Sequence, residues 1–262
     1  MASFTTTHTV EISTPSSLSG ITIRELSGDD VPVTAKVISE AFPLTNTHSW
    51  GRALGLTSNM EGYMTTYLPK PLSKRLGGLG ACIVDSCSPA EKLVGATILE
   101  DYEIFSPSPV ADTTVDQDTV SAAFSAIEGL INECKVVFQR EFERRCTAIH
   151  GESSSLTSSK IGYVAWIATD ESYRGKGVAS ALVDAGCKAL VSQDYEWSTA
   201  FCVSPTATRV FLRQGYELWG EVPYASFTMP DGTTPYSILP DEVSVVVKRL
   251  ISSTTSEQKD AN

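Results

Sequence analysis

The sequence lacks several features that would each define a class of protein. It contains no hydrophobic run approaching the roughly 18 residues of a membrane span, and its start has neither the basic flank nor the apolar stretch of a secretory signal. Basic residues are also scarce, because 20 Lys and Arg stand against 31 Asp and Glu, a net charge of −11. Nucleic acids and anionic membranes are bound through clustered Lys and Arg, so we expect neither as a partner.

Motifs that bind metals or form disulfide frameworks are absent as well. The six cysteines form no CxxC pair, no glycosylation sequon occurs, and no spacing of Cys, His and carboxylate residues predicts a metal site. Scattered thiols of this kind are typical of small core residues in a reducing compartment. We therefore expect a cytoplasmic protein that holds no metal.

The chain has an ordinary globular composition, with 262 residues of which 42% are hydrophobic and 19% are charged. No internal repeat and no shift in composition marks a second domain. We predict a disordered leader over residues 1–19, one α/β domain over residues 20–251 and a disordered tail over residues 252–262.

Hydrophobic periodicity predicts the elements of this domain. Strands are expected at residues 21–26, 81–85 and 93–99, the last two as a hairpin that follows a glycine-rich break at residues 77–80. Pro43 is expected to end the first helix, and helical spacing returns over residues 120–142. Surface loops are predicted at residues 106–118 and 146–160.

The most informative stretch begins with a β-prone apolar run at residues 161–169. A short turn and the sequence Arg174-Gly-Lys-Gly-Val-Ala179 follow, and helical spacing then continues to Val191. The first turn of a helix leaves its N–H groups unpaired and its dipole positive, which makes an anion site. Gly175 and Gly177 let the backbone approach a phosphate, and Arg174 and Lys176 add charge. A plain basic turn is the alternative interpretation, since neither the P-loop nor the dinucleotide fingerprint is present.

This motif resembles that of the GNAT N-acetyltransferase superfamily, whose members carry [Q/R]-x-x-G-x-[G/A] between a central strand and a helix. The resemblance implies an α/β fold with a GNAT-like mixed, mostly antiparallel sheet flanked by helices on both faces. It implies acetyl-CoA as cosubstrate, its pyrophosphate on the backbone amides of the motif and its pantetheine arm along a strand that splays from its neighbour. The cofactor-binding residues implied in this way are Ile167, Ala168, Thr169, Arg174, Gly175, Lys176, Gly177, Val178 and Ala179.

The order of elements is similar to that of the arylalkylamine N-acetyltransferase branch, including the C-terminal segment around residues 222–232 and a last strand at residues 243–250. This resemblance implies an acyltransferase that moves an acetyl group to a primary amine of a small molecule, such as an arylalkylamine or a polyamine, by direct attack in a ternary complex. Two alternatives stay open. One is a protein lysine or N-terminal acetyltransferase, and the other is an inactive module that binds CoA.

Amine acetylation needs a group that takes the proton of the ammonium. Related enzymes carry a Glu in the joint after the first helix, which here contains Glu40 near the helix end and His48. These two are the predicted bases, and Glu100, Asp101 and Glu103 are further candidates or an exposed acidic rim. Aromatic residues are expected either to line an amine pocket or to fill the core, namely Trp50, Tyr63, Tyr67 and Phe227.

The group that protonates the leaving thiolate is less evident. The superfamily often places a Tyr four residues before the glycine of its last helix-to-strand turn, and counting back from Gly215 gives Phe211, which has no proton to donate. Some relatives use serines a few residues earlier, which makes Ser204 the candidate here, with Thr206 and Thr208 beside it. Release of the thiolate to water is the alternative.

Overall fold

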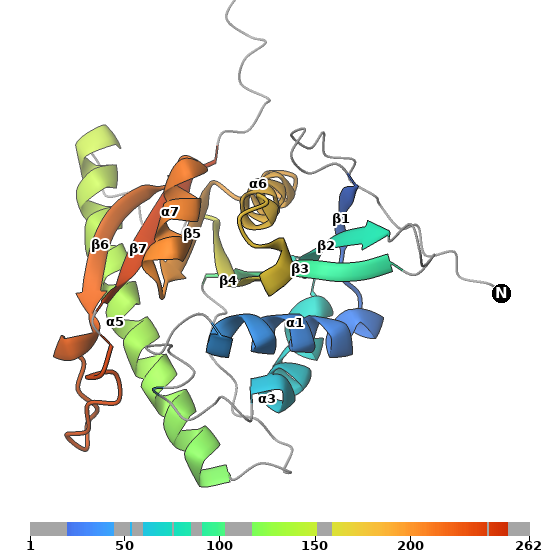
Figure 1. Ribbon diagram of the computed structural model, residues 1–262. Coiled ribbons are helices and arrows are strands. Elements are labelled where there is room, and N and C mark those ends of the chain that lie inside the picture. Colours follow the sequence, from blue (N-terminus) through green and yellow to red (C-terminus); the bar gives the residue numbers. More distant parts are fainter. Residues whose placement is uncertain are drawn as a thin grey trace, which may run out of the picture.

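The apolar runs of the sequence form the strands of one mixed sheet. The computed structural model (Figure 1) describes residues 20–44, 53, 60–74, 76–84, 91–102, 117–150, 159–239 and 241–250. In this part of the chain the sheet has seven strands in the order β1-β2-β3-β4-β5-β7-β6. The strands are β1 (Ile21–Glu25), β2 (Gly78–Val84), β3 (Glu91–Asp101), β4 (Ile161–Thr169), β5 (Trp197–Cys202), β6 (Glu217–Pro223) and β7 (Glu242–Arg249).

Neighbouring strands run antiparallel except β4 and β5, which pair in parallel. Helices cover both faces of this sheet (Figure 1), so the predicted fold class is confirmed. The helices are α1 (Val31–Leu44), α3 (Met60–Tyr67), α4 (Pro69–Leu72), α5 (Gln117–His150), α6 (Val178–Val191) and α7 (Pro205–Arg213).

Two hydrophobic cores lie on the two faces of the sheet. One core packs apolar residues of α1, α3 and α5 against the sheet, and the other packs α6 and α7 against its opposite face. The central strand β3 contributes to both, with Ala96 and Ile98 in the first core and Val94 and Leu99 in the second. A strand buried on both faces reads as a continuous apolar run, which explains why the sequence of β3 shows no alternation.

The predicted hairpin is confirmed, but both of its strands are longer than expected. Strand β2 begins at Gly78 rather than at Ala81, and β3 begins at Glu91 rather than at Leu93. Glycine occupies this part of the strand because the neighbouring side chains leave no room for a Cβ atom. A Cβ atom on Gly80 would lie 2.5 Å from a Leu93 methyl and 2.7 Å from a Leu26 methyl.

Two helix ends also differ from the predictions. Helix α1 continues through Pro43 to Leu44. A proline in the last turn of a helix removes only one backbone hydrogen bond, so the helix need not end there. Helix α5 starts at Gln117 and runs to His150, so the loop predicted at residues 146–160 is wrong for its first part. The preceding helical turn is polar because its arginines pair with carboxylates, as in the 2.7 Å contact between Arg145 and Glu217.

Several predictions concern residues outside the described part of the chain. These are the leader over residues 1–19, the tail beyond residue 250, His48, Trp50, Glu103 and most of the loop predicted at residues 106–118.

A substitution at Phe138 tests which face of α5 packs against the sheet. Its ring is fully buried and lies 4.8 to 5.7 Å from the rings of Tyr102, Phe142 and Trp219. Phe138→Ala should lower the free energy of unfolding by about 3–5 kcal/mol in urea denaturation, since it leaves a cavity among these rings. Val136→Ala is the control, because Val136 is 58% exposed on the same helix and should change stability by less than about 0.5 kcal/mol. Equal effects would contradict this orientation of α5.

Candidate functional site

The parallel strands β4 and β5 diverge soon after they meet. Residues Ile161–Tyr163 pair with Trp197–Thr199, and the register of these two strands ends there. Beyond that point β4 stays paired with β3 as far as Thr169, and β5 stays paired with β7 as far as Cys202. The second halves of β4 and β5 therefore turn two backbone edges toward a wedge-shaped gap. This is the divergence that the family resemblance implied.

A tight turn connects β4 to the start of α6. Gly175 and Gly177 have φ angles of 74° and 89°, a left-handed conformation that residues with a Cβ atom rarely adopt. Gly177 is the N-cap of α6 and, as a glycine, places no side chain over the first turn of the helix. The N–H groups of the first helical turn have no acceptor within the helix, and the residues of this turn border the cavity described below, as the predicted anion site requires.

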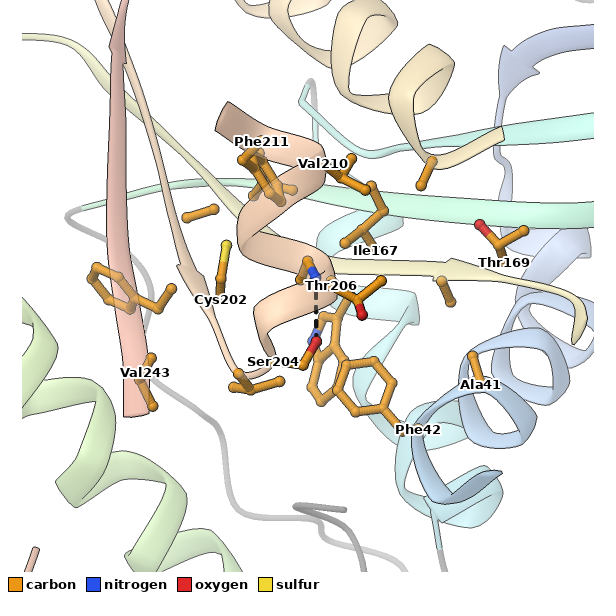
Figure 2. Close-up of a pocket in the computed structure, with 18 of the residues that line it drawn as sticks. Ala41, Phe42, Ile167, Thr169, Cys202, Ser204, Thr206, Val210, Phe211 and Val243 are labelled. Carbon is orange, nitrogen blue, oxygen red and sulfur yellow. Dashed lines mark hydrogen bonds between the residues drawn. The ribbon is translucent and has the colours of Figure 1, made fainter. Parts of the chain in front are cut away.

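A cavity of about 990 Å³ passes between β4 and β5. Its walls come from α6 and α7 on one face of the sheet and from α1, α3 and α5 on the other, so it connects the two faces. Figure 2 shows side chains from these elements around one space, with Ile167 and Thr169 on β4, Ser204 and Thr206 at the start of α7, and Phe42 at the end of α1.

The structure brings most of the predicted cofactor residues to this cavity. Eight of the nine contribute to its wall: Ile167, Ala168, Thr169, Arg174, Gly175, Gly177, Val178 and Ala179. Lys176 does not, since its Nζ atom lies over the ring of Tyr173, 4.6 Å from the centroid. Thr169 Oγ1 is buried without a hydrogen-bond partner in the described part of the chain, so a ligand in the gap would satisfy it.

Sequence reasoning missed three polar residues of the same wall. Ser180 follows the motif in the first turn of α6, and Arg209 and Arg213 lie one helical turn apart on α7. Arg209 and Arg213 make the α7 side of the cavity positive, although the chain as a whole is acidic. The guanidinium of Arg174 instead donates a 3.5 Å hydrogen bond to the Ala41 carbonyl at the end of α1. The spacing of four residues between Arg209 and Arg213 was the available signal.

The opposite side of the cavity is apolar and aromatic. Tyr63 and Tyr67 of α3 line it, and so does Tyr163 of β4, whereas Phe227 is buried against Tyr236 as a core residue. Tyr63 is a core residue and also part of the pocket wall, because it is 4% exposed and still borders the cavity.

Two cysteines, Cys134 of α5 and Cys202 of β5, also border the cavity. Burial raises the pKa of the Cys134 thiol to about 12 and raises the pKa of Cys202 further still. Both sulfurs are therefore held in the thiol form near neutral pH, and the thiol is a poor nucleophile.

Ser204 lies at the N-cap of α7 and lines the cavity (Figure 2). Its Oγ atom accepts a hydrogen bond from the N–H of Ala207 at 3.3 Å. A hydroxyl that accepts in this way keeps its own proton to donate elsewhere. Phe211, about two helical turns further on, is 1% exposed and packs edge-on against Tyr216 with 4.9 Å between ring centroids.

The carboxylates predicted as bases have different surroundings. Glu40 points to solvent on α1, where its side chain is 55% exposed and lies 3.9 Å from Lys36. It does not border the cavity, although its neighbours Ala41 and Phe42 do. Asp101 accepts a hydrogen bond from the Tyr195 hydroxyl at 3.1 Å. Glu100 is buried rather than part of an exposed rim, and it accepts a 2.8 Å hydrogen bond from Tyr67.

The described residues contain neither a metal-ligand cluster nor a membrane-spanning helix. Among them, no group of three or more His, Cys, Asp or Glu side chains is arranged to hold a metal ion. None of the helices described has the length and apolar character to cross a membrane.

Sequence comparison identifies a segment of this site. Residues 138–216 match the model of the acetyltransferase (GNAT) family, a stretch that runs from the second half of α5 to Tyr216 and includes β4, the glycine-rich turn, α6, β5 and α7. No curated protein is similar enough in sequence to count as a match.

Solved structures share the fold at low identity. Arylalkylamine N-acetyltransferase 2 from Aedes aegypti is 11% identical with a TM-score of 0.58, over 89% of this chain and 100% of that one. The polyamine N-acetyltransferase of Drosophila melanogaster, which forms N-acetylagmatine, is 14% identical with a TM-score of 0.55, over 88% and 100%. The C-terminal condensation domain of Ebony, in complex with β-alanyl-dopamine, is 11% identical with a TM-score of 0.62, over 87% and 98%.

The glycine-rich turn can be tested with a pair of matched substitutions. Gly177→Glu should abolish acetyl-CoA binding in calorimetry, because a side chain and a negative charge would occupy the anion site. Gly232→Glu is the control, since Gly232 has a similar φ of 85°, is exposed and does not border the cavity. Both variants carry the same backbone strain and the same added charge. Binding by a folded Gly177→Glu variant would refute the assignment of this turn.

Proposed function

We propose that this chain is a member of the GNAT superfamily and transfers the acetyl group of acetyl-CoA to a primary amine of a small molecule such as an arylalkylamine or a polyamine. The observation that carries the proposal is the cavity that passes through the sheet. It joins an anion site at the start of α6 to an aromatic pocket on the opposite face. Both substrates of an acetyl transfer can therefore meet between β4 and β5.

The residues of the α6–α7 side fit acetyl-CoA, which supplies the acetyl group as a reactive thioester. The first-turn amides of α6 would hold the pyrophosphate, with Arg174, Arg209 and Arg213 as positive neighbours. The unpaired edge of β4 from Ile167 to Thr169 would hydrogen-bond the pantetheine amides and direct the thioester toward the middle of the sheet. Backbone N–H groups at this edge can also stabilise negative charge on the thioester oxygen.

The aromatic side of the cavity fits a small amine better than a folded protein. It is bounded by α1, α3 and α5, and its wall is built from rings and aliphatic side chains. Concave sites lined mainly by rings and aliphatic side chains are typical of small-molecule sites. Arylalkylamine and polyamine acetyltransferases among the structural neighbours share the fold, which supports this choice of acceptor.

Direct attack of the amine requires no covalent enzyme intermediate. Cys134 and Cys202 are the cysteines on the cavity wall, and their raised pKa values keep them from acting as thiolate nucleophiles. Together with Cys82 and Cys187 they are buried and form no disulfide, which suits a reducing compartment such as the cytoplasm. We therefore propose a ternary complex in which the amine attacks the thioester within the cavity.

The proposed transfer is tested by thiol release from acetyl-CoA with a panel of acceptors. The panel contains arylalkylamines, polyamines, amino acids, amino sugars and a lysine peptide. Turnover with a small amine is the expected result, and turnover with the peptide alone would favour a protein acetyltransferase. Binding of acetyl-CoA without any thiol release would identify an inactive CoA-binding module and refute the proposal.

Ser204 is proposed to protonate the leaving thiolate. Ser204→Gly removes the hydroxyl, while glycine at an N-cap costs only a few tenths of a kcal/mol. We expect kcat to fall about 10²-fold with acetyl-CoA affinity unchanged, which steady-state kinetics and calorimetry would measure. Ser204→Thr keeps both the cap and the hydroxyl and is the control. If Ser204→Gly retains the kcat of the unmodified protein, the thiolate leaves to water instead.

A further inference from the structure

Four aromatic side chains form a wall on the α1–α3 side of the cavity: Phe42, Tyr63, Tyr67 and Trp166. Their ring centroids lie 5.0 to 6.4 Å from one another in the contacting pairs. Aromatic faces attract ammonium cations, and more strongly where water is excluded. This wall therefore suits an alkylamine in the charged form in which it arrives from solution.

A buried carboxylate lies directly behind this wall. Glu100 on β3 is 5% exposed, and its Oε2 atom accepts a hydrogen bond from the Tyr67 hydroxyl at 2.8 Å. Its Cα atom pairs across the sheet with that of Tyr163, another residue of the cavity wall. Glu100 thus lies next to two residues of the cavity wall, Tyr67 through a hydrogen bond and Tyr163 through strand pairing.

The groups that face Glu100 come from α3, from the end of α4 and from β4, and they are Tyr63, Tyr67, Lys70, Lys74 and Tyr163. Burial opposes the charge of the carboxylate and raises the pKa of Glu100 above its ordinary 4.5, although Tyr67 and the two lysines lower it. A carboxylate with a raised pKa is the stronger proton acceptor.

The tyrosine can connect the cavity to this carboxylate. The Tyr67 oxygen donates its proton to Glu100 and still has lone pairs with which to accept. The indole N–H of Trp166 provides one hydrogen bond to this oxygen, which lowers the pKa of Tyr67, while burial beside Glu100 raises it overall. A tyrosine that is held protonated in this way can relay a proton without itself becoming charged.

We infer that Tyr67 takes a proton from the acceptor ammonium while it passes its own hydroxyl proton to Glu100. One N–H bond of the ammonium breaks as a new O–H bond forms on Tyr67, and the former Tyr67 proton forms the carboxylic acid of Glu100. The positive and negative charges cancel, and a neutral amine is left in the cavity. Without such a group only about one molecule in a few thousand of an alkylamine with a pKa near 10.4 is neutral at pH 7.

The inference rests on the proposed amine acetylation, and Glu100→Gln tests it. Glutamine keeps the shape of the side chain and can still accept the Tyr67 hydrogen bond, so we expect the fold and acetyl-CoA affinity to persist. At pH 7 kcat/KM for the amine should fall about 10²-fold. The kcat/KM of the unmodified protein should rise with pH through the pKa of Glu100 and then level off. That of the variant should rise about tenfold per pH unit with the fraction of neutral amine.

Two further variants test whether the Tyr67 hydroxyl is required and whether loss of any nearby negative charge has the same effect. Tyr67→Phe removes the hydroxyl alone and should reproduce both the fall and the altered pH profile. Asp101→Asn removes the next carboxylate on the same strand, one that contacts Tyr195 instead, and should leave kcat/KM and its pH profile unchanged.

The outcomes distinguish this inference from the proposed function. Turnover by the unmodified protein together with an unchanged pH profile in Glu100→Gln would overturn the inference and leave the acetyl transfer standing. A loss by the same factor at every pH would assign Glu100 a structural role only, which also overturns it. The absence of turnover by the unmodified protein with every amine would refute both.

Discussion

The early end of the parallel pairing between β4 and β5 is the constraint on which the rest of the site depends. Each strand is held by its other neighbour, β4 by β3 and β5 by β7, so the two separate after three paired residues. A continuous sheet would bury this backbone in a ladder and close the passage between its faces. Because the ladder stops, the cavity can cross the sheet and keep two unpaired strand edges along its wall.

The two sides of the passage differ in chemistry. The side formed by α6 and α7 is positive and rich in backbone N–H groups, which suits phosphates and amides. The side formed by α1 and α3 is aromatic, with the buried Glu100 behind it. In the proposed reaction an anionic cosubstrate and a cationic acceptor would thus bind at opposite ends. The overall negative charge of the chain therefore coexists with a local basic site.

Residues close together in sequence were predicted well. The run from β4 through Arg174-Gly-Lys-Gly177 to α6 is local, and its order of strand, turn and helix follows from periodicity and from glycine alone. Glu40 shows where such reasoning fails. It stands next to two cavity residues, yet a step of one residue turns a helical side chain by about a quarter turn, and Glu40 faces solvent.

The sequence alone predicted the fold class and the glycine-rich turn between β4 and α6, since each depends on local pattern or on resemblance to a family. It also located acidic residues at the end of β3, but not which of them is buried. That strand is apolar on both faces, so its pattern carries no alternation from which the direction of Glu100 could be predicted. Only the packing of α3 against that face of the sheet decided it, because the pairing of Glu100 with Tyr67 joins residues 33 positions apart.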